Sequence, residues 1–275
     1  MLLRLGYDID FELPRATAFV AMLHVHPSRA GDLREPDELR IDPALQMDSY
    51  LDSFGNICTR FEAPEGIVRL SNRTLVEDSG DPDPVCLDAE EIPVAELPSD
   101  VMRYLLSSRY CEVDRMSAEA VDLFGGVDPG WGRVQAVCDW VHQKVAFGYH
   151  FARPTKTALD VFTERQGVCR DFQHLAITFL RALNIPARYA TGYLGDIRVP
   201  PAPSPMDFSA WFQVYLADGR GEGRWWTFDA RHNQPRVGRV LMAVGRDAAD
   251  VAITTSFGVA NLKHFFVVSD EVTQE

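Results

Sequence analysis

The stretch Gly167-Val168-Cys169-Arg170-Asp171-Phe172-Gln173-His174 places a cysteine just after a glycine, at the predicted start of a helix. Apolar residues follow at steps of three and four, which is typical of an amphipathic helix. They are Val168, Phe172, Leu175, Ala176, Phe179, Leu180 and Leu183. Cys169 falls on this apolar face, so its thiol is expected to point into the fold, where the helix N-terminus favours the thiolate. Pro186 ends the helix, because proline cannot continue one.

The residues after this helix predict an antiparallel sheet. Residues 187–194 have the composition of a strand, and the proline-rich segment 197–207 is expected to be a surface loop that can cover a cleft. Two apolar runs, 210–216 and 224–229, flank a glycine-rich turn and predict a β-hairpin. Residues 240–268 are expected to complete the same sheet.

The first part of the chain predicts strands. Leu3, Leu5, Tyr7, Ile9 and Phe11 alternate with mostly polar residues, which is the pattern of a half-buried strand. Several more short runs follow at near-regular spacing, as in a β-sandwich. An acidic, proline-containing segment, 78–98, is the predicted linker. We therefore expect an N-terminal β-rich domain over residues 1–95 and a second domain with helices over 96–275.

The composition argues against two classes of partner. The chain has 275 residues, 46% of them hydrophobic, and a formal net charge of −13. An acidic surface disfavours nucleic acid and anionic membranes as partners. No apolar run is long enough for a spanning helix and no targeting segment stands out, so the expected compartment is the cytoplasm.

The cysteines agree with a reducing compartment. They are Cys58, Cys86, Cys111, Cys138 and Cys169. Their number is odd and no C-x-x-C pair is present, so neither a disulfide framework nor a zinc cluster is expected. No metal and no cofactor is implied.

A cysteine at a helix start, followed by a hairpin with polar residues, is the layout of Cys-His-Asp catalysis. In that chemistry an imidazole takes the thiol proton and later protonates the leaving group. The carboxylate fixes the tautomer of the imidazole. The base commonly comes from a neighbouring strand, since it must lie within hydrogen-bond reach of the thiol.

Three strings make the sequence similar to the bacterial transglutaminase-like superfamily, which includes cysteine proteases. They are Gly167-Val168-Cys169-Arg170-Asp171-Phe172, Ile185-Pro186-Ala187-Arg188-Tyr189 and, in the N-terminal part, Phe54-Gly55-Asn56. The resemblance implies an α+β fold: an N-terminal β-sandwich, then a papain-like, transglutaminase-like domain with helices packed on an antiparallel sheet. It also implies a protein or peptide substrate.

The resemblance also implies site residues, and one of them departs from the family pattern. The family aspartate in an F-D string corresponds to Asp229 of Phe228-Asp229. The family histidine in an H-A-W string corresponds to Ser209 of Ser209-Ala210-Trp211. Serine cannot act as a base near neutral pH. The predicted catalytic set is therefore Cys169, Ser209 and Asp229, with the base missing.

Two histidines are candidates to replace that base. One hairpin register puts Ser209 opposite His232, and a tighter turn puts it opposite residue 230. His232 is therefore a possible base or, alternatively, a surface or supporting residue. His174 lies five residues after Cys169, about 140° round the helix, and is expected to be structural. Trp211 is a candidate for substrate binding, with sheet core as the simpler interpretation.

Two functions remain open on the sequence alone. The first is a cysteine enzyme that acts on amide bonds, as a peptidase, an amidase or an acyltransferase, through a thioester on Cys169. Its activity would be impaired by serine at position 209. The second is a catalytically inactive relative that serves as a binding or scaffolding module. Turnover that is abolished by Cys169→Ala would separate them.

Overall fold

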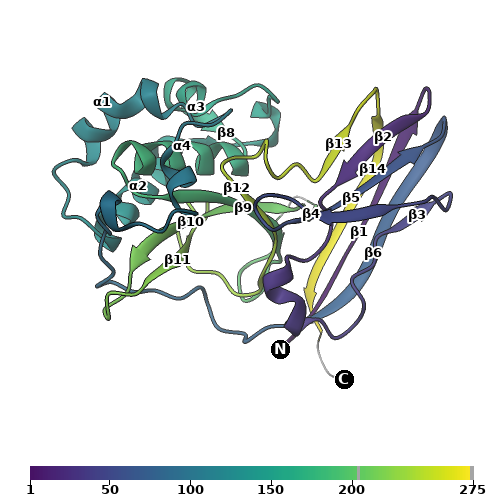
Figure 1. Ribbon diagram of the computed structural model, residues 1–275, viewed down its shortest axis with the longest axis horizontal. Helices are drawn as coiled ribbons and strands as arrows, with labels where there is room; N and C mark the ends of the chain where they lie inside the picture. The colour runs from purple at the N-terminus through teal and green to yellow at the C-terminus, as the bar shows by residue number, and fades with distance from the viewer. Residues whose placement is uncertain (203–204, 273–275) are drawn as a thin grey trace.

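The protein is described by a computed structural model that covers residues 1–202 and 205–272 (Figure 1). Residues 203 and 204 of the proline-rich loop lie outside the described part of the chain. Helices and one antiparallel sheet form one half of the molecule, and two further antiparallel sheets form the other half. The fold is therefore a mixed one, with helices packed on antiparallel strands.

The sheet beside the helices has the strand order β11-β10-β9-β12. Its strands are β9 (Ala187–Leu194), β10 (Ser209–Ala217), β11 (Gly223–Phe228) and β12 (Arg239–Gly245). The hairpin of β10 and β11 forms as predicted, with Ala217 paired to Gly223 and Phe212 to Phe228. The predicted strand over 187–194 is confirmed by β9.

Helix α4 (Cys169–Ala182) packs on one face of this sheet, and three further helices pack against α4. These three are α1 (Val113–Phe124), α2 (Trp131–Lys144) and α3 (Ala158–Glu164). The apolar face of α4 is buried against β9 and β10 in a cluster that includes Phe172, Leu175 and Phe179. Asn184, with φ of 63°, lies in the left-handed region just after α4 and turns the chain toward β9. Burial of this amphipathic face holds the start of α4 against the sheet.

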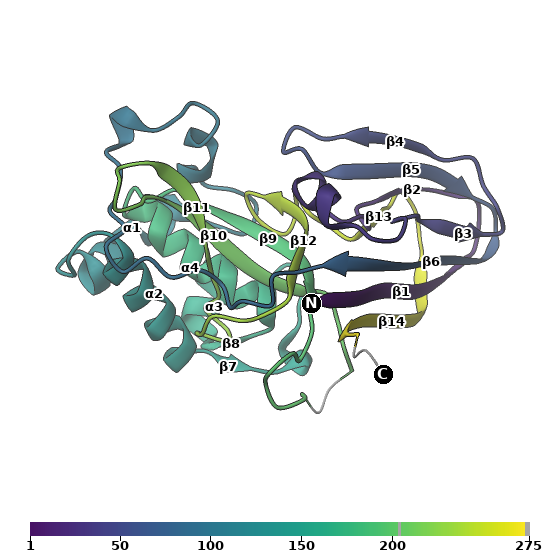
Figure 2. The ribbon, with the colours of Figure 1, turned by 90° about the horizontal axis from the view of Figure 1, so that it is seen from below.

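The other half contains two four-stranded antiparallel sheets (Figure 2). One has the order β14-β1-β6-β3 and the other the order β13-β2-β5-β4. Side chains from both sheets, such as Leu5, Phe19 and Leu70, share one hydrophobic cluster with Val240 of β12. The strands are β1 (Leu2–Leu13), β2 (Thr17–Ala21), β3 (Arg40–Asp42), β4 (Asp48–Leu51), β5 (Ile57–Ala63), β6 (Gly66–Glu77), β13 (Thr254–Ser256) and β14 (Asn261–Glu271).

The short elements lie mainly in connections. Two parallel strands, β7 (Ala146–Phe147) and β8 (Gln166–Gly167), pair just before α4. The 3-10 turns are η1 (Pro27–Asp32), η2 (Val94–Glu96), η3 (Met102–Leu105) and η4 (Tyr149–Phe151).

The C-terminal strands correct one expectation from the sequence. Residues 240–268 were expected to complete the hairpin sheet, and only β12 does so, beside β9. β14 pairs along almost the whole length of β1, and β13 pairs with β2. The chain therefore returns to the sheets of its N-terminal half, because β1 and β2 leave edges that these strands satisfy.

A buried asparagine links the two halves. The side-chain amide of Asn56 donates to the carbonyl oxygen of Val244 at 2.8 Å, and its side-chain oxygen accepts from the Val244 N–H at 2.9 Å. Because both atoms are buried, loss of this pair would leave polar groups unsatisfied. Asn56 of the Phe54-Gly55-Asn56 string therefore fixes the N-terminal hairpin loop on β12.

Candidate active site

Cys169 is the first residue of α4 and is half-buried. The side chain of Asp171 accepts a hydrogen bond from the Val168 N–H at 2.9 Å and so closes the first turn. A Cβ at Gly167 would lie only 2.6 Å from the Cβ of Asp171. Glycine at this position thus permits the close approach of the chain that sets Cys169 at the helix start.

The electrostatics at Cys169 correct the expectation of a favoured thiolate. Burial raises the pKa of the Cys169 thiol to about 11, and the carboxylate of Asp207 adds to this. The guanidinium of Arg231 opposes the rise without reversing it. Desolvation of the charged form therefore outweighs the helix N-terminus, and the isolated thiol is protonated at neutral pH.

Asp229 lies directly after β11 and is almost completely buried. Its Oδ1 accepts from the Gln173 side chain at 3.1 Å and from the Arg231 N–H at 3.0 Å. Burial opposes its ionisation, but the Arg239 guanidinium and the His232 hydrogen bond hold the pKa of Asp229 below its usual range. The carboxylate of Asp229 is therefore ionised at neutral pH, and its hydrogen bonds hold it in one orientation.

Arg239 on β12 supplies the charge that keeps Asp229 ionised. Its Nη2 donates to Asp229 Oδ2 at 3.0 Å, and its Nε donates to Asp83 Oδ2 at 2.8 Å. Asp83 comes from the segment that the sequence marks as a linker, so that segment supports the site. Sequence reasoning missed both residues, because nothing local in the sequence pairs residue 83 or 239 with 229.

His232 follows Asp229 in the same tight turn. Its Nδ1 lies 2.8 Å from Asp229 Oδ2, and its backbone N–H donates to Asp229 Oδ1 at 3.1 Å. The side chain of His232 is 22% exposed, so solvent reaches part of it. This contact is the one that an orienting carboxylate makes with a catalytic imidazole.

A small hollow joins the predicted site residues. Its volume is about 70 Å³, and its wall includes Cys169, Ser209, Arg231 and His232. Cys169, the serine in the expected histidine position and His232 therefore line one space, and Asp229 contacts the imidazole of His232. The hairpin register pairs Gln213 with Thr227, and its continuation would place Ser209 opposite Arg231, between the two alternatives considered from the sequence.

A second and larger cavity lies against the same cysteine. It has a volume of about 540 Å³, and Cys169, Ser209, Tyr189 and Phe208 are among its lining residues. Cys169 and Ser209 thus line both spaces.

Trp211 and His174 both pack inside the fold. Trp211 is 2% exposed, packs with Ala190 and Val244 under the Arg239 guanidinium, and lines neither hollow. His174 is buried and its Nε2 accepts from the Ala248 N–H at 3.1 Å, as expected for a supporting histidine. Burial lowers the pKa of His174 well below its usual value, so it remains neutral.

Gln173 is a further residue that the sequence did not single out. Its side-chain amide nitrogen donates to the Ala210 carbonyl and to Asp229, each at 3.1 Å. Its side-chain oxygen accepts from the Ala230 N–H at 3.1 Å. One side chain on α4 therefore connects the cysteine helix to β10 and to the residues directly after β11. Its position one turn after Cys169, on the buried side, was the available signal.

Residues 1–202 and 205–272 meet neither the requirements of a metal site in their side chains nor those of a membrane span in their helices. No group of three His, Cys, Asp or Glu side chains in this range is arranged to hold a metal ion. In the same range, no helix has the length and apolar character needed to cross a bilayer. All five cysteines are free thiols.

Comparison with known proteins gives a consistent result. Residues 118–230 match the profile of the transglutaminase-like superfamily, a span that includes Cys169, Ser209 and Asp229 and ends before His232. A solved structure described as a "putative cysteine protease" from Cytophaga hutchinsonii superimposes with a TM-score of 0.84 and 30% identity. That match covers 100% of this chain and 92% of the other.

Curated mycobacterial proteins are also similar. An uncharacterized protein of Mycobacterium leprae is 26% identical over 217 residues, which is 76% of this chain and 75% of that protein. An uncharacterized protein of Mycobacterium tuberculosis is 36% identical over 97 residues, or 34% of this chain and 31% of that protein. The similarity to the mycobacterial protein from M. leprae thus extends well beyond the segment around Cys169.

Proposed function

This chain belongs to the transglutaminase-like superfamily, and on that basis we propose that it is a cysteine enzyme acting on amide bonds of peptides or proteins. The observation that carries the proposal is the 2.8 Å contact of Asp229 with His232, a residue that lines the same hollow as Cys169. The name given to the Cytophaga structure supports the same class.

The proposal gives each residue one role. Cys169 is the nucleophile, His232 is the general base and Asp229 orients the base. In the neutral tautomer that donates Nδ1–H to Asp229, the Nε2 atom of His232 is an acceptor and can take the thiol proton. Ser209, where the family places its histidine, leaves space in the hollow for the His232 ring. The ring therefore replaces the family base from a different position in the chain.

The reaction divides into two acyl-transfer steps. In the first, His232 takes the proton from Cys169 as the sulfur attacks the amide carbonyl carbon. The C–N bond then breaks, the amine leaves with that proton, and a thioester remains on Cys169. In the second step water or another amine attacks the thioester and its proton passes to His232. The sulfur leaves as the thiolate and regains that proton. Water gives hydrolysis, and an amine gives transamidation.

A non-catalytic role is the second candidate, and two observations favour it. Ser209 stands at the family histidine position, and burial raises the pKa of Cys169 to about 11. A thiol that is hard to ionise and lacks its usual base fits a binding or scaffolding module. General-base assistance by His232 during attack removes this difficulty, because the thiolate need not accumulate beforehand.

The proposal extends to the rest of the chain. We infer that the two sheets of the N-terminal half form a β-sandwich module, which the chain leaves near residue 95 for the catalytic part and rejoins through β13 and β14. Free thiols persist in reducing compartments, which supports the cytoplasm as the place of action.

Two assays of the full chain test the proposed activity. Fluorescein-labelled casein reports hydrolysis, and incorporation of dansylcadaverine into casein reports transamidation. Wild type is expected to give a rate in at least one assay, and Cys169→Ala is expected to abolish it. Cys86→Ala is the matched control, since Cys86 is also a half-buried free thiol and lines neither hollow. Equal rates for wild type and Cys169→Ala would contradict the proposed enzymatic activity and favour the role as a binding module.

A further inference from the structure

The larger cavity beside Cys169 is lined mainly by apolar and aromatic side chains. Its volume of about 540 Å³ lies in the range of pockets that take a small molecule or a bulky side chain. The lining residues that give it this character are Tyr110, Tyr189, Phe208, Val251, Ile253 and Phe265. Three alanines, Ala248, Ala249 and Ala252, form part of the wall and leave the space open.

The charged residues on this wall are already engaged elsewhere. Arg153 pairs with Asp160 at 3.1 Å and with Glu164 at 2.9 Å. Arg170 contacts Asp171 at 3.2 Å and also donates to the Arg153 carbonyl oxygen.

Asp207 is the third residue with a charged side chain on the wall, and it carries a carboxyl group. Burial raises its pKa, which favours its neutral form relative to an exposed aspartate. A charged group that entered the cavity would lose its water without gaining a free partner, and that is costly.

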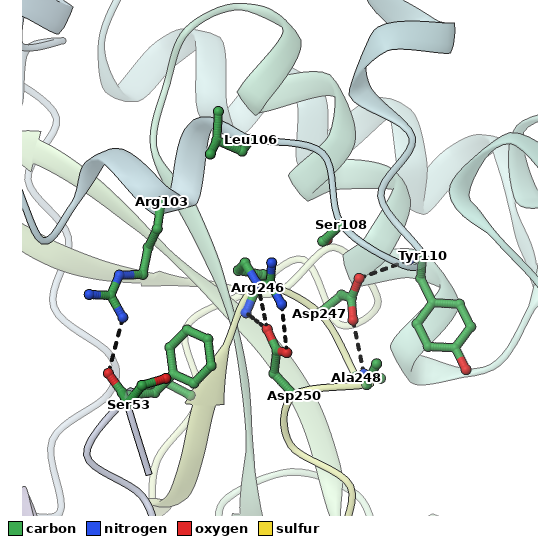
Figure 3. A network of polar contacts seen from close by, with 12 residues as sticks. Ser53, Arg103, Leu106, Ser108, Tyr110, Arg246, Asp247, Ala248 and Asp250 are labelled. Atoms are coloured by element: carbon green, nitrogen blue, oxygen red, sulfur yellow. Dashed lines mark hydrogen bonds and ion pairs between the residues drawn. The ribbon is translucent and has the colours of Figure 1, made fainter.

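The alanine wall is held in place by a polar network (Figure 3). Asp247 accepts from the Tyr110 N–H at 2.8 Å and from the Ala249 N–H at 2.9 Å. The N–H of Ala248 donates to the buried His174, and Asp250 accepts from the N–H and the guanidinium of Arg246 at 2.9 Å. The segment is therefore fixed before any ligand binds, which reduces the entropy lost on binding.

We propose that this cavity is the acyl-donor side-chain pocket and that it selects a bulky, uncharged, apolar side chain. The inference rests on the proposed function for the identity of the nucleophile, Cys169. Aromatic rings on several sides give an entering ring or branched alkyl group apolar surface to bury. The fixed alanine segment limits the size of the group.

Irreversible labelling of Cys169 tests the pocket without requiring turnover. The probes are N-acetyl amino-acid chloromethyl ketones with the side chains of Phe, Leu, Gly, Asp and Lys. The sulfur displaces chloride, so one C–S bond forms, one C–Cl bond breaks and the thiol proton passes to a base. Peptide mapping by mass spectrometry assigns the label to Cys169, and iodoacetamide, which has no side chain, reports the reactivity of the thiol alone.

The Phe and Leu probes are expected to label Cys169 about tenfold or more faster than the Gly, Asp and Lys probes. Ala252→Phe and Ala249→Phe fill the wall and are expected to slow the Phe probe while leaving iodoacetamide unchanged. Ala249 is exposed, so that variant is tolerated even where Ala252→Phe disturbs folding. Ala118→Phe, at an exposed position of α1 away from the cavity, is the control.

The proposed pocket would be contradicted if all probes labelled Cys169 at the same rate. It would also be contradicted if Ala249→Phe and Ala252→Phe were labelled by the Phe probe at the rate of the Ala118→Phe control. The outcomes separate the two proposals. If labelling depends on the side chain of the probe but casein is not turned over, the proposed pocket is supported and the proposed enzymatic activity is contradicted. If casein is turned over but labelling does not depend on the side chain, the activity is supported and the pocket is contradicted.

Discussion

The Nδ1 atom of His232 lies 2.8 Å from Oδ2 of Asp229, and Nη2 of Arg239 lies 3.0 Å from the same oxygen. One carboxylate oxygen therefore serves both an imidazole and a buried guanidinium. The imidazole and the carboxylate are three residues apart in a single turn, whereas the family pattern takes them from two strands.

Asp229→Asn is expected to destabilise the fold as well as to remove activity. It leaves Arg239 buried with only Asp83 as a charged partner, and breaking a buried pair costs about 3 kcal/mol. Urea unfolding measures the loss. The pKa of Asp229 is lowered by folding, so its contribution is present above the usual aspartate pKa and declines as the pH falls through the folded value.

Asp122→Asn, on the exposed side of α1, is the control for that measurement. An Asp229→Asn variant as stable as this control would show that Asp229 does not compensate Arg239.

The thiol of Cys169 is expected to react slowly with iodoacetamide. Its pKa of about 11 reduces the thiolate fraction, and the greater nucleophilicity of a more basic thiolate offsets part of this. At pH 8 the rate should be about tenfold below that of a thiol in an unstructured peptide, and it should still be rising above pH 10. Labelling faster than the peptide, with a plateau near neutral pH, would instead indicate a preformed thiolate–imidazolium pair.

His174 is expected to make stability depend on pH in the acid range. Burial lowers its pKa from 6.5, so the unfolded chain binds a proton that the folded chain excludes. Stability is therefore full above pH 6.5 and is lost as the pH falls below it, by up to about 1.4 kcal/mol per pH unit. Urea unfolding from pH 7 to pH 4 measures this slope.

His174→Gln removes the titrating group and keeps an acceptor for the Ala248 N–H. The variant should lose less stability than wild type over the same pH range. A slope identical to that of wild type would assign the acid sensitivity to other groups.

Ser209→His is expected to give no gain in turnover. Ser209 is 7% exposed, and the hollow that it shares with His232 has a volume of only about 70 Å³, so an imidazole that enters this hollow is overpacked and competes with His232 for the same space. The initial rate on casein measures the effect, with melting temperature as the check on folding. A rate increase of about 10² or more would place the functional base at position 209.

The sequence predicted the parts of this site that depend on local patterns. The periodicity around Phe172 located the cysteine helix, and the two apolar runs located the hairpin that carries Asp229. The tertiary contacts could not be predicted, because no local sequence pattern indicates that Arg239 pairs with Asp83 or that β14 pairs with β1. The expected thiolate at Cys169 was wrong because burial outweighs the helix N-terminus, and burial is a property of the packed fold.

The rate at which the His232→Gln variant hydrolyses casein tests most directly the claim that His232 is the general base. Glutamine can still donate a hydrogen bond to Asp229 but cannot take a proton from Cys169. The matched control is His264→Gln, at an exposed position of β14. The proposed base predicts that His232→Gln lowers the initial rate on casein by about 10²–10⁴-fold, toward the Cys169→Ala background, with His264→Gln unchanged. A His232→Gln variant that turns over casein at the wild-type rate would contradict the account.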